Sequence, residues 1–191
     1  SDINHDGVND WGLLGKNKVD GRWQLIQKDG SDPRGVLQIH AWPGDFVDPR
    51  FVVLPDMSGD GIEEVAMFGV RGSVGRVQMI IKDGVDRNSV IGTYGWADVF
   101  VDTRFNVTND LTGDGVPDIV FSGKLENERW QTFIINAATN ERIFRQVSKA
   151  SITNDIEIRT SHDINFNGRM DLLIFGRDNT GVLQSEVFLL P

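Results

Sequence analysis

The chain has 191 residues, of which 39% are hydrophobic and 25% charged, a composition typical of a folded globular protein. Its formal net charge of −9 gives no surplus of basic residues that could bind phosphate groups. We therefore expect it to bind neither nucleic acid nor an anionic membrane surface. No apolar run reaches the ~20 residues of a membrane-spanning helix, which predicts no membrane insertion. Cysteine is absent, which excludes disulfides and cysteine–zinc sites.

Short apolar runs separated by Gly and Asp predict β-strands along the chain. They are clearest at 51–54, 65–68 and 77–81, with a weaker run at 90–94. The best helical candidate is 140–150, although its residues 143–147 fit a strand equally well. The pattern therefore predicts an all-β chain built from groups of about four antiparallel strands.

An acidic segment recurs four times, at 2–10, 56–64, 110–118 and 163–171, with offsets of 54, 54 and 53 residues. A Gln in the following apolar run recurs at nearly the same spacing, as Gln24, Gln78, Gln131 and Gln184. We divide the chain into approximate repeats 1–47, 48–101, 102–154 and 155–191, which together form a single domain, 1–191.

Repeated four-stranded sheets at this period predict the blades of a β-propeller, because one such sheet must stack on neighbours to cover its faces. A β-sandwich or a string of separate β modules is the alternative. The first repeat lacks its first strand, the fourth repeat lacks its last, and the chain opens at Ser1 without Met. We therefore expect a processed piece that is an arc of a larger propeller, completed by further repeats in the parent chain or by a second chain; a compact four-bladed ring is the alternative.

Each acidic segment has the form Asp-x-[Asn/Ser/Thr]-x-[Asp/Asn]-Gly-x-x-[Asp/Glu]. When the backbone curls, side chains at positions 1, 3 and 5 converge, Gly at position 6 allows the turn, and position 7 offers its carbonyl. Hard oxygen donors favour Ca²⁺ over zinc or copper. The alternative is that the segments are plain Asp-Gly and Asn-Gly turns.

With position 9 counted as a ligand, loops one to three each supply three carboxylates, and loop four, with two and a nearby Arg, should bind most weakly. The predicted ligands are Asp2, Asn4, Asp6, Val8 and Asp10 in loop one; Asp56, Ser58, Asp60, Ile62 and Glu64 in loop two; Asp110, Thr112, Asp114, Val116 and Asp118 in loop three; and Asp163, Asn165, Asn167, Arg169 and Asp171 in loop four.

These loops are not EF-hands. An EF-hand needs a bidentate Glu at position 12, where this sequence has Leu13, Met67, Phe121 and Ile174. Extracellular calcium modules bind with Kd on the order of 10⁻⁴–10⁻³ M, so such sites would be largely empty at cytosolic Ca²⁺. We therefore expect up to four structural Ca²⁺ ions and an extracellular or cell-surface location.

The acidic loop followed by a strand ending in Phe-Gly, as at 67–69 and 174–176, resembles the FG-GAP (integrin α-type, or VCBS) repeat over essentially the whole chain. The resemblance implies a propeller of seven or eight blades with Ca²⁺ between the first and second strands of a blade. It also implies a secreted or cell-surface protein that acts in adhesion or carbohydrate binding.

Among other candidates, Trp42 and Trp96 occupy matched positions beside glycines and are predicted to be exposed ligand contacts, such as sugar-stacking platforms. Trp23 and Trp130, also matched, are predicted to lie between blades. No Ser-His-Asp arrangement or unassigned carboxylate pair is visible, so we expect a non-enzyme.

Three functions follow as hypotheses: an extracellular binding or adhesion module that recognises a protein or glycan, a non-catalytic ancillary domain of a carbohydrate-active enzyme, or a stand-alone lectin.

Overall fold

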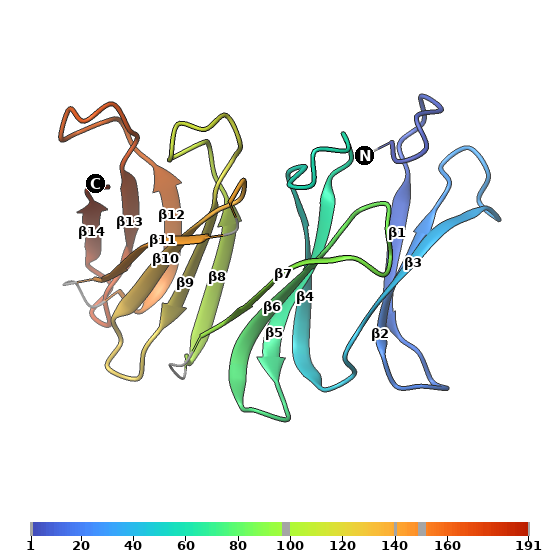
Figure 1. Cartoon of the computed structure of the whole chain (residues 1–191). Helices are drawn as coiled ribbons and strands as arrows, with labels where there is room; N and C mark the ends of the chain where they lie inside the picture. The colour runs from blue at the N-terminus through green and yellow to red at the C-terminus, as the bar shows by residue number, and fades with distance from the viewer. Residues whose placement is uncertain (1, 97–99, 140, 149–151, 191) are drawn as a thin grey trace. The chain divides into compact units, whose positions relative to one another are not determined.

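A computed structural model describes residues 2–96, 100–139, 141–148 and 152–190, and Figure 1 shows its strands. The described residues form four antiparallel sheets of three or four strands and contain no helix, which confirms the all-β prediction. No helix in the described part of the chain is therefore available to cross a membrane. The chain divides into two compact units, Ser1–Ala97 and Asp98–Pro191.

The first unit contains two sheets that follow one another in the chain. The first sheet has the strand order β1-β2-β3, and the second has the order β4-β5-β6-β7. The strands are β1 (Trp11–Lys16), β2 (Trp23–Lys28), β3 (Val36–Trp42), β4 (Phe46–Leu54), β5 (Glu64–Arg71), β6 (Arg76–Lys82) and β7 (Val90–Gly95).

The second unit repeats this arrangement with a four-stranded sheet, ordered β8-β9-β10-β11, and a three-stranded sheet, ordered β12-β13-β14. Residues 141–147 of the helical candidate form strand β11, whereas Asn140, Lys149 and Ala150 lie outside the described residues. The strands are β8 (Asp102–Val107), β9 (Ile119–Lys124), β10 (Trp130–Asn136), β11 (Glu141–Val147), β12 (Asn154–Thr160), β13 (Leu172–Arg177) and β14 (Leu183–Phe188).

Residues at matched positions of the sequence repeat also pair at matched positions in the sheets. In β5 and β6 Met67 lies opposite Ile80, and at the matched place in β1 and β2 Leu13 lies opposite Ile26. The central strands β5, β9 and β10 are buried on both faces, as their continuous runs of Val, Ile, Met and Phe require. Within each unit the two acidic loops lie at the same end of the sheets (Figure 1).

Trp42 joins the two sheets of the first unit. Its side chain is fully buried, and its indole N–H donates to the carbonyl of Ile80 in β6 at 3.1 Å. The ring also meets Phe51 edge to face, at 6.3 Å between centroids. The buried core around it contains Leu25, Trp42, Phe46, Val65, Met67 and Ile80.

Trp23 and Trp130 form matched contacts, one in each unit. The Trp23 indole donates to the carbonyl of Phe46 at 3.2 Å, and the buried Trp130 indole donates to the carbonyl of Ile152 at 2.8 Å. In both cases the acceptor belongs to the segment that leads into or begins the next sheet. The prediction that these tryptophans lie between blades is confirmed.

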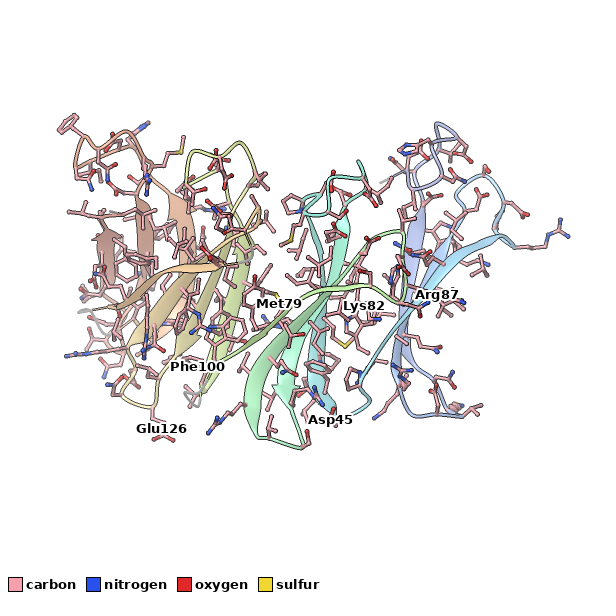
Figure 2. All side chains as sticks on the ribbon, in the orientation of Figure 1. Asp45, Met79, Lys82, Arg87, Phe100 and Glu126 are labelled. Atoms are coloured by element: carbon pink, nitrogen blue, oxygen red, sulfur yellow. The ribbon has the colours of Figure 1, made fainter. Side chains whose placement is uncertain are left out.

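The side chain of His40 in β3 is fully buried. Its Nε2 lies 3.0 Å from Oε1 of Gln27, its Nδ1 has no hydrogen-bond partner, and Lys82 (labelled in Figure 2) lies on the neighbouring sheet. Burial, reinforced by the positive charge of Lys82, lowers the pKa of His40 to about 4. The folded protein therefore holds this imidazole neutral over a pH range in which the unfolded chain protonates it.

We predict that Trp42→Ala lowers the free energy of unfolding by about 3–5 kcal/mol, because it removes a fully buried ring and an inter-sheet hydrogen bond. Trp11→Ala is the matched control, since Trp11 is 43% exposed. Urea denaturation of both variants measures the difference. Equal losses would contradict the assignment of Trp42 to the core.

A second prediction concerns acid stability. The folded pKa of His40 lies below the ordinary value of 6.5, so its contribution to stability is complete above pH 6.5 and is lost as the pH falls toward about 4. Chemical denaturation at pH 7, 5.5 and 4.5 should show this loss, and His40→Gln should remove it. His162→Gln, at an exposed position outside the strands, serves as control.

Candidate metal-binding loops

All four acidic loops share one hydrogen-bond pattern. The Gly amide at position 6 donates to the carboxylate at position 1 in every loop, over 2.7–2.8 Å. This bond closes the loop and fixes the direction of the first carboxylate. The four pairs are Gly7 with Asp2, Gly61 with Asp56, Gly115 with Asp110, and Gly168 with Asp163.

The side chain at position 5 is held in the same way. Its Oδ1 accepts the amide N–H of position 7 over 2.8–3.0 Å in each loop, as in Asp60 with Ile62. At position 3, Oδ1 of Asn4 and of Asn165 accepts the amide of position 5, whereas the Ser58 and Thr112 hydroxyls donate to the first carboxylate. The side chains at positions 1, 3 and 5 are therefore all ordered by their own loop.

The loop backbone is left-handed at two places. Position 6 is Gly in all four loops, with φ between 87° and 90°. Position 4 also has positive φ throughout: Gly59 and Gly113 adopt it at little cost, whereas His5 (φ 60°) and Phe166 (φ 57°) adopt it under strain. A shared backbone conformation at both positions accounts for the recurrence of the sequence pattern.

The residue at position 9 bridges two segments of the chain. In loop two, Glu64 Oε1 accepts the Met57 amide at 3.1 Å and Oε2 accepts the Gly84 amide at 2.8 Å. Asp10 and Asp171 bridge in the same way, from the position 2 amides of Ile3 and Ile164 to the amides of Gly30 and Leu190. This carboxylate therefore ties the acidic loop to the segment that follows β2, β6 or β14 in loops one, two and four.

This finding corrects the expectation that three carboxylates surround one point. Within the described ranges, no three Asp, Glu, His or Cys side chains form a group suited to a metal ion. The carboxylates of Asp10, Glu64 and Asp171 are turned to backbone amides, and Asp118 accepts the Leu111 amide at 2.7 Å. Positions 1, 3 and 5 and the position 7 carbonyl provide the donors within the curl itself, and position 9 as a metal ligand stays a prediction.

The carboxyl groups at positions 1 and 9 differ in the direction in which their pKa values are shifted. It raises the pKa of Glu64 and of Asp118, and amide donors offset it only in part. Burial also acts on Asp56 and Asp110, but there the donors, led by the Gly amides at position 6, outweigh it and the pKa is lowered. The carboxylates of Asp56 and Asp110 are therefore held ionised at neutral pH.

Loops three and four are tied to neighbouring segments by amide groups. In loop four the Nδ2 groups of Asn165 and Asn167 donate to the Leu190 carbonyl at 2.9 and 2.6 Å. In loop three the Asn136 Nδ2 donates to Asp114 Oδ2 at 2.6 Å and to the Thr112 hydroxyl at 3.2 Å. Because positions 3 and 5 of loop four are both Asn, Asp163 is the single carboxylate among its positions 1, 3 and 5.

The donor set fits Ca²⁺ by its chemistry. Positions 1, 3 and 5 of loops one to three offer carboxylate, amide and hydroxyl oxygens, and position 7 offers a carbonyl, all of them hard ligands. The first and fifth positions are both Asp in these loops, so two anionic side chains lie in one tight curl. A divalent cation would offset their repulsion.

The prediction that Trp42 and Trp96 are exposed ligand contacts is wrong. Trp42 is 0% exposed and Trp96 is 2% exposed, with its ring edge to face against Phe68. Each tryptophan ends or follows the outer part of its sheet, and there it turns inward to the core. Trp11, by contrast, is 43% exposed on β1 and follows directly after the loop residue Asp10.

No family model and no curated protein matches the sequence. Among solved structures, the chain is similar to the Dos1 propeller, with a TM-score of 0.55 and 14% sequence identity. The similarity covers 93% of this chain and 41% of the Dos1 propeller chain, so the chain spans less than half of that protein's length. This similarity and the four antiparallel sheets establish a β-propeller fold.

We predict that Gly61→Ala lowers the free energy of unfolding by about 1–2 kcal/mol, because a Cβ at φ +88° is strained although no atom lies within 4 Å of it. Gly15→Ala is the matched control, since its Cβ also meets nothing within 4 Å and its φ is ordinary. Thermal and urea unfolding compare the two variants. A Gly61→Ala protein as stable as Gly15→Ala would show that the loop adopts another backbone conformation.

Proposed function

We propose that this chain is a calcium-stabilised β-propeller binding module of the FG-GAP type. The observation that carries the proposal is the single hydrogen-bond pattern shared by all four acidic loops, which orders oxygen donors at positions 1, 3 and 5. Plain Asp-Gly turns need no matched donors at positions 1, 3, 5 and 7 in four separate copies.

In this proposal the ions are structural, and the position 9 carboxylates stabilise the loops by accepting their backbone amides. Loop four is the weakest site, because Asp163 is its only carboxylate at positions 1, 3 and 5, and the amides of Asn165 and Asn167 bind Leu190. When bound, each Ca²⁺ supplies positive charge that offsets the repulsion between the carboxylates at positions 1 and 5. Millimolar affinity would place the protein outside the cytoplasm, on a cell surface or secreted.

We propose a non-catalytic role, with a protein or glycan as the ligand. A stand-alone lectin and an ancillary domain of a carbohydrate-active enzyme are weaker alternatives, because the two tryptophans expected to stack on sugars are buried. The exposed apolar side chains lie instead on strand edges and loops, which favours recognition of protein over recognition of glycan.

The test is thermal unfolding in 5 mM CaCl₂ and in excess chelator, together with calorimetric titration of Ca²⁺. At roughly tenfold excess over Kd, each occupied site should contribute roughly 1.4 kcal/mol. Chelation should therefore lower the Tm, and Asp60→Ala should remove one site and reproduce about 3–6 °C of that fall.

Asp20→Ala is the matched control. Asp20 also accepts an amide two residues further on, that of Arg22 at 3.0 Å, but it lies in the β1–β2 turn and outside the acidic loops. It should leave the calcium stoichiometry and the chelator effect unchanged. The proposal fails if chelator leaves the Tm unchanged, or if Asp20→Ala lowers the stoichiometry as much as Asp60→Ala does.

A further inference from the structure

One side chain from outside the acidic loops reaches into loop three. Asn136, the last residue of β10, donates from Nδ2 to Asp114 Oδ2 at 2.6 Å and to the Thr112 hydroxyl at 3.2 Å. Thr112 and Asp114 are positions 3 and 5 of the loop, so this nitrogen lies where two of the three side-chain donors converge. Asn136 is only 7% exposed, so its amide group is withdrawn from solvent.

The turn after β10 fixes the orientation of this amide group. Asn136 Oδ1 accepts the backbone N–H of Thr139 at 2.8 Å. Because the oxygen faces this donor, the NH₂ group faces loop three. A rotation that offered the oxygen to the loop would turn the NH₂ group against the Thr139 N–H and break that bond. Asn136 therefore meets loop three as a hydrogen-bond donor and not as an oxygen ligand.

The matched residues of the first two sheets stabilise the same turn with a carboxylate. They are Asp29 and Asp83, which, like Asn136, lie five residues after the repeated Gln. Oδ1 of each accepts the backbone N–H three residues further on, at 3.1 Å for Asp29 and 2.6 Å for Asp83. Their second terminal atom is an oxygen, and an ionised carboxylate cannot donate. The third repeat thus keeps the turn and replaces an acceptor by a donor.

Loops two and three are otherwise nearly the same site. Positions 1, 3 and 5 are Asp, Ser and Asp in loop two and Asp, Thr and Asp in loop three, and in both loops the hydroxyl donates to the first carboxylate. In loop three both oxygens of Asp114 are engaged, Oδ1 by the Val116 amide at 3.0 Å and Oδ2 by Asn136. A cation that used Oδ2 of Asp114 and the Thr112 hydroxyl would compete with Asn136 for the same oxygens.

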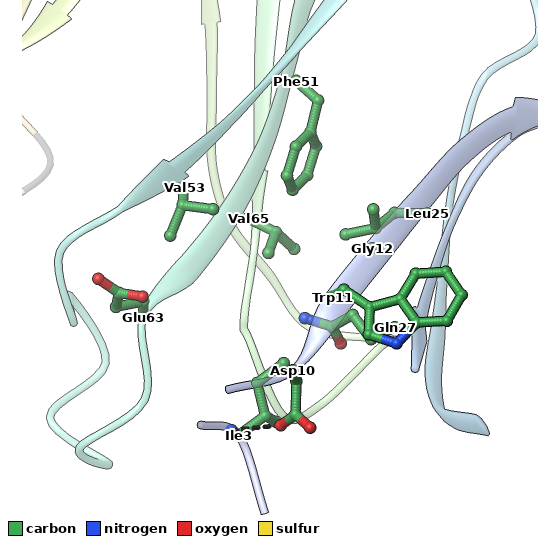
Figure 3. A pocket seen from close by; sticks show the side chains of 10 residues that line it. All are labelled: Ile3, Asp10, Trp11, Gly12, Leu25, Gln27, Phe51, Val53, Glu63 and Val65. Carbon is green, nitrogen blue, oxygen red and sulfur yellow. Dashed lines mark hydrogen bonds between the residues drawn. The ribbon is translucent and has the colours of Figure 1, made fainter. Parts of the chain in front are cut away.

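The position 9 carboxylates bind their loops in a different way. Figure 3 shows the example of loop one, where Asp10 accepts the Ile3 amide at 2.6 Å beside a cavity of about 120 Å³. In loop three Asp118 likewise accepts the Leu111 amide at 2.7 Å. These carboxylates engage the loop backbone, whereas Asn136 engages the side-chain oxygens of the loop.

We propose that the amide group of Asn136 competes with a divalent cation for loop three, so that loop three binds Ca²⁺ more weakly than loop two. Asn136 holds Thr112 and Asp114 together through two hydrogen bonds, and a cation at the same oxygens costs those bonds. The inference rests on the proposed calcium function but concerns one loop of four, so the two can fail separately.

Calcium titration followed by ¹H–¹⁵N correlation spectra reports on each loop, because the amides of Gly61 and Gly115 donate to the first carboxylates of loops two and three. In the parent chain Gly115 should titrate at a higher calcium concentration than Gly61. In Asn136→Ala the Gly115 midpoint should fall by about tenfold, since tenfold corresponds to about 1.4 kcal/mol, close to the net contribution of one hydrogen bond to a charged group. A purely structural role would raise that midpoint instead, because the loop would lose two bonds that order it.

Asn127→Ala is the matched control. Asn127 Oδ1 also accepts a turn amide, that of Arg129 at 3.2 Å, but its turn joins β9 to β10, at the end of the sheet opposite the acidic loop. This variant should leave the midpoints of Gly61 and Gly115 unchanged. In Asn136→Ala the Gly61 midpoint should also stay unchanged, which shows that the effect is confined to loop three.

A second measurement uses the parent chain and needs no variant. The side-chain NH₂ resonances of Asn136 should shift with the same calcium midpoint as the Gly115 amide. The inference is overturned if these resonances stay unchanged while Gly115 titrates, if Asn136→Ala binds no more tightly at Gly115, or if Gly115 titrates in neither protein while Gly61 does. If neither glycine responds to Ca²⁺ in any of the proteins, the calcium proposal itself fails.

Discussion

The carboxylate at position 9 of each repeat, which is buried in repeats two to four, is the contact on which the arrangement of loops and sheets depends. Glu64 and Asp171 are fully buried, and each accepts one amide from its acidic loop and one from beyond the third strand of the same sheet. A buried carboxylate is costly unless its oxygens are hydrogen-bonded, whereas hydrogen bonds to a charged group contribute about 1.5–3 kcal/mol each. The two segments are therefore held together, because separating them would leave the charge unpaired.

This bridge explains how the loops can be acidic and still have one conformation. With position 9 turned inward, the anionic groups that remain near one another are those at positions 1 and 5, and their own backbone amides orient them. Amide donors lower the pKa of Asp56 and of Asp110, so these groups are ionised whether or not a cation is bound. A cation that bound such a loop would meet donors that are already ordered, which would reduce the entropic cost of binding.

Local patterns predicted most of the fold and much of the loops, whereas long-range contacts decided the rest. The repeat period, the strands and the Gly at position 6 could be predicted because each depends on neighbours in the chain. The role of Glu64 could not, since its second partner, Gly84, lies 20 residues away. The burial of Trp42 could not be predicted for the same reason. Its neighbours Pro43 and Gly44 are typical of a surface turn, but its indole N–H donates to the carbonyl of Ile80, 38 residues further along the chain.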